Sequence, residues 1–107
     1  MAKGKNPRMT AAAGLSKREL DMIRSVLARH EEISGAFLFG SRAKATAEPF
    51  SDIDLSLLGT NDRLLAEEIA AELDELPLPY RFDVNAFNTI RHQPLREHIQ
   101  RVGVKIY

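Results

Sequence analysis

The segment FLFGSRAKATAEPFSDIDLSLLG, residues 37–59, places two short apolar runs on either side of a loop of small and polar residues. The loop begins with Gly40-Ser41-Arg42, and it leads into Asp52-Ile53-Asp54 at its other end. Burying a carboxylate without a compensating partner is energetically costly. Two carboxylates two residues apart in an apolar run therefore indicate one of two things. Either a cation is bound there, or the chain tolerates an unfavourable pair of charges.

The composition describes one globular domain. The chain has 107 residues, of which 44% are hydrophobic and 28% charged, and its 15 basic residues balance 15 acidic ones. This balance gives no net attraction to nucleic acid or to an anionic membrane. The absence of cysteine fits a reducing cytoplasm, and no apolar run approaches the ~20 residues of a transmembrane helix. We expect residues 1–14 to form a flexible tail and residues 15–107 to form one folded domain in the cytoplasm.

Apolar spacing and the positions of glycine and proline predict the order of the elements. The expected elements are a helix beginning after Ser16, strands over 36–39 and 52–58, a helix over 61–76, a strand over 80–87, a helix over 94–102 and a short strand over 104–107. Ser16 and Glu19 form an S-x-x-E capping box, and Pro77 prevents the second helix from continuing. This order predicts an α/β or α+β fold, with a small mixed sheet and flanking helices.

Strand periodicity assigns the carboxylates to one face of the sheet. Successive residues of a strand point to opposite faces, so Asp52, Asp54 and Ser56 share the face opposite Ile53, Leu55 and Leu57. The Cα atoms of the two aspartates are then about 6.6 Å apart. In the 80–87 strand the same alternation puts Asp83 on a polar face. If the two strands are neighbours, Asp83 joins the pair.

Three such carboxylates would repel one another. At separations of ~4 Å the repulsion amounts to several kcal/mol at an effective dielectric constant near 20, and at least one carboxyl would have its pKa raised. A divalent cation removes this conflict. Ligands that are all oxygen suit magnesium, with manganese as the second choice.

The other end of the loop has the chemistry of an anion site. Gly40-Ser41 follows a strand directly, and glycine lets backbone N–H groups approach an anion closely. Arg42 either binds phosphate or fixes the loop through a salt bridge. A phosphate-binding turn that faces three metal-binding carboxylates is the layout of metal-assisted phosphoryl or nucleotidyl transfer.

These motifs resemble a known family. Gly40-Ser41, ten further residues and then Asp52-Ile53-Asp54 are similar to the signature of the polymerase-β-type nucleotidyltransferase superfamily. The segments FGSRAKATAEPFSDIDLSL, LPYRFDVNAFNTI and PLREHIQRVGVKIY resemble its small prokaryotic members, the minimal nucleotidyltransferases. The resemblance covers about residues 15–107 and implies a polymerase-β-like fold. Ala45 is one departure, because the family often has glycine there.

The resemblance also implies an activity and a partner. Minimal nucleotidyltransferases are antitoxins that form hetero-oligomers with HEPN-domain ribonuclease toxins, and they transfer AMP from ATP to a toxin tyrosine. Carried over to this chain, Gly40, Ser41 and Arg42 would bind the nucleotide. Asp52 and Asp54 would hold two Mg²⁺ ions, and Asp83 would complete the catalytic site and help to activate the attacking hydroxyl. No direct binding to nucleic acid or to a membrane is expected.

Other interpretations remain open from the sequence. The chain could neutralise a toxin by binding alone, with a vestigial site, or it could modify a small molecule, although it offers no second domain to build an acceptor pocket. His30, His92 and His98 have no paired metal-ligand spacing and are interpreted as structural or surface residues. The acidic residues of the 61–76 helix are interpreted as a solvated face, with contact to a basic toxin surface as the alternative.

Overall fold

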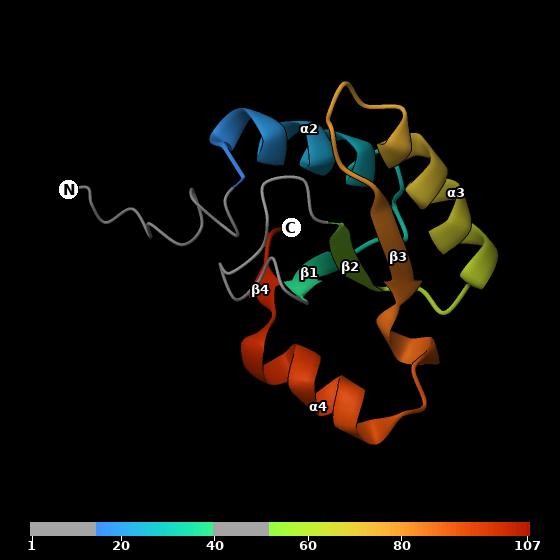
Figure 1. The fold of residues 1–107 in the computed structure, drawn as a ribbon. Coiled ribbons are helices and arrows are strands. Elements are labelled where there is room, and N and C mark those ends of the chain that lie inside the picture. Colours follow the sequence, from blue (N-terminus) through green and yellow to red (C-terminus); the bar gives the residue numbers. More distant parts are fainter. Residues whose placement is uncertain (1–14, 40–51) are drawn as a thin grey trace.

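The computed structural model describes residues 15–39 and 52–107, and these form one small α/β unit (Figure 1). The elements follow the order α2 (Lys17–Leu27), β1 (Gly35–Phe39), β2 (Ile53–Leu58), α3 (Arg63–Asp74), β3 (Phe82–Ala86), the 3₁₀ helix η2 (Phe87–Thr89), α4 (Gln93–Val102) and β4 (Val104–Lys105). The predicted tail over residues 1–14 and the loop over residues 40–51 lie outside the described residues. Every other predicted element is present.

The four strands form one mixed sheet in the order β3-β2-β1-β4. β1 is antiparallel to both β2 and β4, whereas β2 and β3 are parallel. This confirms the predicted small mixed sheet, and it makes β2 and β3 direct neighbours. The pairing required to bring the carboxylates together is therefore present.

Helices α2 and α3 pack against one face of the sheet and enclose the main core. Leu20, Ile23 and Leu27 of α2 are fully buried, and they share one cluster with Leu55 and Leu57 of β2. The capping box forms as predicted, because the backbone N–H of Glu19 donates to Ser16 Oγ and the backbone N–H of Ser16 donates to Glu19 Oε1. Burial of a leucine side chain contributes about 1.5–3 kcal/mol, so these contacts dominate the stability of the layer.

Helix boundaries differ slightly from the sequence prediction. α3 covers residues 63–74 rather than 61–76, because Asp62 caps its first turn by accepting a hydrogen bond from the backbone N–H of Leu64. His30 continues the apolar spacing of α2 but lies beyond the end of that helix at Leu27. His30 therefore belongs to the turn that leads into β1.

α4 lies apart from α2 and α3 (Figure 1) and contacts β1. The end of α4 approaches the sheet closely, because a Cβ atom added at Gly103 would lie 3.4 Å from Cβ of Phe37. Phe37 pairs with Ser56 of β2, so α4 packs over the face of the sheet opposite the main core. Asp54 belongs to that same face.

The turn after β2 requires glycine. Gly59 has φ +101°, which side chains of L-residues rarely adopt. A Cβ atom there would lie 2.2 Å from the carbonyl oxygen of Glu32. Gly59 thus fixes the exit from β2 against the turn that precedes β1.

Candidate active site

Two of the three predicted carboxylates lie directly opposite each other. In the parallel pair of β2 and β3, Asp54 is the register partner of Asp83. Alternation along both strands puts them on the face away from the main core, because their neighbours Ile53, Leu55 and Phe82 are buried in it. Asp83 is exposed, whereas Asp54 is partly buried.

Asp52 lies one residue before β2 and is exposed. It is close enough for its charge to affect Asp54. Burial raises the pKa of the Asp54 carboxyl above its usual value, and the negative charges of Asp83 and Asp52 raise that pKa further. A raised pKa from burial and like charges is the response that the sequence predicted for this cluster. The charges of Asp52 and Asp83 therefore both act on the Asp54 carboxyl.

No positive side chain offsets this cluster within residues 15–39 and 52–107. The ion pairs in that part of the chain join Lys17 and Arg24 to Asp21, and His30 to Glu72. The aspartates have no such partner there. A set of carboxylates offers only oxygen donors, which magnesium and manganese prefer.

A hydrogen bond joins the two strands two register positions from the aspartate pair. Ser56 pairs with Asn85 in the parallel register, and Ser56 Oγ donates to Asn85 Oδ1 at 2.7 Å. Ser56 is fully buried, and it is the one buried polar side chain of the described part of the chain. This bond restrains β2 against β3 where the Asp54–Asp83 pair must keep its register. Ser56 and Asn85 both lie two residues after an aspartate, so alternation puts each on the same face of the sheet as that aspartate.

The predicted nucleotide-binding residues fall in the segment 40–51, which the structure does not describe. Gly40, Ser41 and Arg42 lie outside the described residues, as does Ala45. The last described residue before them is Phe39, which ends β1 and is the register partner of Asp54.

Comparison with known proteins defines the class of this chain. Residues 21–107 match the family model "Polymerase beta, Nucleotidyltransferase". The match covers most of the chain, so the protein belongs to the polymerase-β nucleotidyltransferase family and is a nucleotidyltransferase.

Individual proteins give a more specific comparison than the family model. The chain is 29% identical over 98 residues to "Probable protein adenylyltransferase MntA" of Haemophilus influenzae, covering 90% of this chain and 85% of that protein. Its fold matches a chain of the "toxin-antitoxin with AMP-PNP" crystal structure with a TM-score of 0.68 at 20% identity, over 87% of this chain and 73% of that chain. It also matches a chain of the tri-AMPylated Shewanella oneidensis HEPN toxin in complex with MNT antitoxin. There the TM-score is 0.66 at 19% identity, over 85% of this chain and 71% of that chain. At these identities the structural matches confirm the predicted polymerase-β-like fold.

The helices of the described part carry no membrane-spanning segment. None of them combines the length and the apolar character needed to cross a bilayer.

Proposed function

We propose that this protein is the antitoxin of a HEPN toxin–antitoxin pair, and that it transfers AMP from ATP to a tyrosine hydroxyl of its toxin. The observation that carries the proposal is the in-register pairing of Asp54 with Asp83, with Asp52 beside them, in a chain of the nucleotidyltransferase family. The similarity to a probable protein adenylyltransferase supports the transfer to a protein. The fold shared with a chain of an AMPylated HEPN toxin complex supports the partner.

Asp52, Asp54 and Asp83 fit a divalent metal site. Their donors are all oxygen, and Asp54 and Asp83 are register partners on neighbouring strands. Burial of Asp54, followed by the negative charges of Asp83 and Asp52, raises the pKa of the Asp54 carboxyl. We therefore assign them to two Mg²⁺ ions. Magnesium bound there would neutralise charge on the phosphates and on the attacking and leaving oxygens.

The nucleotide and the acceptor have separate roles in this scheme. Gly40 and Ser41, with Arg42, hold the triphosphate of ATP in this proposal. The tyrosine oxygen attacks the α-phosphorus of ATP and forms a new O–P bond, and the bond from that phosphorus to its bridging oxygen breaks. Pyrophosphate leaves with the electron pair of the broken bond. Asp83 helps to activate the hydroxyl by accepting its proton as the tyrosine oxygen attacks.

Label transfer tests the proposal. The protein is incubated with Mg²⁺, ATP labelled in its α-phosphate, and its cognate HEPN protein. We expect label on that protein with the wild-type chain and none with Asp54→Asn. Glu31→Gln serves as the matched control, because it removes one negative charge from an exposed turn and should leave transfer unchanged. Absence of label with wild type, although the two proteins associate, would favour neutralisation by binding alone.

A further inference from the structure

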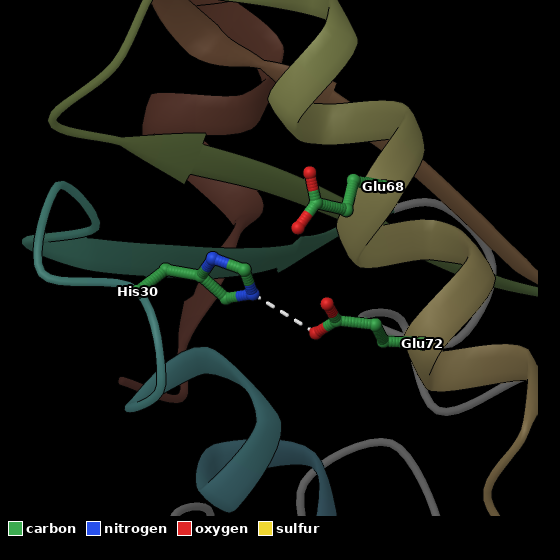
Figure 2. Close-up of side chains that lie close together, drawn as sticks. All are labelled: His30, Glu68 and Glu72. Atoms are coloured by element: carbon green, nitrogen blue, oxygen red, sulfur yellow. Dashed lines mark hydrogen bonds and ion pairs between the residues drawn. The ribbon is translucent and has the colours of Figure 1, made fainter.

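A second group of metal-ligating side chains lies in the helical layer of the molecule. His30, Glu68 and Glu72 each offer one ligand atom, and these atoms all lie within 4.8 Å of one another. Figure 2 shows the imidazole of His30, from the turn after α2, facing the carboxylates of Glu68 and Glu72 on α3. The two glutamates are four residues apart, so they project from the same side of their helix.

The His30 side chain is held in place rather than free in solvent. Its exposed fraction is 12%, and that of Glu72 is 27%. His30 Nε2 lies 2.9 Å from Glu72 Oε1. A simple structural pair would need only these two residues. Glu68 adds a second carboxylate to the same point, and no Lys or Arg of residues 15–39 and 52–107 forms an ion pair with either glutamate.

We propose that His30, Glu68 and Glu72 form a binding site for a divalent transition metal, with Zn²⁺ as the preferred ion. One imidazole nitrogen and two carboxylate oxygens are donors that zinc accepts, at about 2.0–2.2 Å from the metal. Tetrahedral ligands at these distances are about 3.3 Å apart. The His30–Glu72 separation of 2.9 Å is already near that value. The long, exposed side chain of Glu68 completes the set by a change of rotamer.

This site is separate from the aspartate cluster. His30, Glu68 and Glu72 belong to the layer formed by α2, α3 and the turn after α2. Asp54 and Asp83 project from the opposite face of the sheet. The donor sets also differ, because the aspartate cluster offers only oxygen whereas this site includes a nitrogen, which favours zinc over magnesium. A bound ion would connect the turn after α2 to α3 and stabilise the helical layer.

Zinc titration by calorimetry tests the site in a protein that carries Asp52→Asn and Asp54→Asn. That background removes the competing oxygen site, so the result does not depend on the proposed AMP transfer. We expect zinc to bind with one site per chain, and His30→Gln or Glu68→Gln to weaken the affinity at least tenfold. Glu67→Gln is the matched control, because Glu67 lies next to Glu68 but lines a pocket on the β3 side with Arg63 and Val84.

Thermal unfolding distinguishes a metal site from a simple ion pair. Zinc should raise the unfolding midpoint of the background protein and of Glu67→Gln, and at the same zinc concentration it should raise the midpoint of Glu68→Gln clearly less. Glu68→Gln should fold normally, because Glu68 is exposed and not needed for the His30–Glu72 contact. Equal zinc affinity in Glu68→Gln and Glu67→Gln, or no zinc binding to the background protein, would overturn the proposal.

Discussion

Replacing Asp54 by asparagine should make the metal-free protein more stable while it removes activity. Asp54 and Asp83 are register partners on neighbouring strands, and such strands lie about 4.8 Å apart. Two unit charges about 5 Å apart repel by about 0.8 kcal/mol at the dielectric constant of water and by about 3.3 kcal/mol at an effective value of 20. Asp83 is exposed, so screening favours the lower limit. We expect Asp54→Asn to raise the free energy of unfolding by about 1 kcal/mol.

Urea unfolding at pH 7 in the presence of a chelator measures this gain. Glu31→Gln controls for the change in net charge and should alter stability by less than about 0.5 kcal/mol. Added salt should reduce the gain of Asp54→Asn, because exposed charges are screened. Saturating Mg²⁺ should stabilise wild type, by about 2.7 kcal/mol at a hundredfold excess over the dissociation constant, but not the variant. A metal-free variant less stable than wild type would refute the reasoning.

The pH dependence of stability follows from the raised pKa of Asp54. Between the unfolded value, about 3.9, and the higher folded value, the folded protein holds more protons than the unfolded chain. The contribution of Asp54 to the free energy of unfolding therefore falls as the pH rises through that window, and it stays at its reduced level above it. Metal-free Asp54→Asn should lack this fall. Parallel pH profiles for the two proteins would contradict the assignment.

Three further substitutions probe separate parts of the account. Ser41→Ala should weaken ATP binding by about 1.5–3 kcal/mol, because the loss of a hydrogen bond to a charged oxygen has that cost. Calorimetry should show little effect on Mg²⁺ binding. Unchanged ATP affinity would count against the role of Ser41. Ser56→Ala should lower the free energy of unfolding by about 1–3 kcal/mol, because Asn85 Oδ1 loses its buried donor. Unchanged stability in urea unfolding would mean that this hydrogen bond does not restrain the strands. Gly59→Ala should lower the free energy of unfolding by more than about 1 kcal/mol, because φ is +101° and the new Cβ would overlap the Glu32 carbonyl oxygen. Wild-type stability of this variant in urea unfolding would show that the turn can rearrange.

The sequence predicted the fold well because its signals were local. The capping box at Ser16 and the proline after α3 depend on neighbouring residues, and alternation in the segment 52–58 assigned its faces. The adjacency of β2 and β3 needed one further assumption, since a parallel pair has no local signal. The register of Asp54 with Asp83 confirms that assumption.

Other features depend on tertiary contacts and had no sequence signal. His30 was interpreted as structural because no second ligand stands at a suitable spacing. The structure brings it to Glu72, 42 residues away. The Ser56–Asn85 bond also depends on strand pairing, because a buried serine on a polar strand face is indistinguishable from an exposed one in sequence. The acidic face of α3 is accordingly not uniformly solvated, since Glu72 is partly buried.

Intact mass spectrometry of the HEPN partner tests the central claim most directly. The proposed partner is incubated with this protein, ATP and Mg²⁺, then separated from it and assayed for RNA cleavage. We predict a mass increase of one or more adenylate groups and loss of cleavage that persists after separation. Asp54→Asn should give neither effect, although the two proteins still associate. An unshifted mass, together with full neutralisation by Asp54→Asn, would contradict the account and leave binding alone as the mechanism.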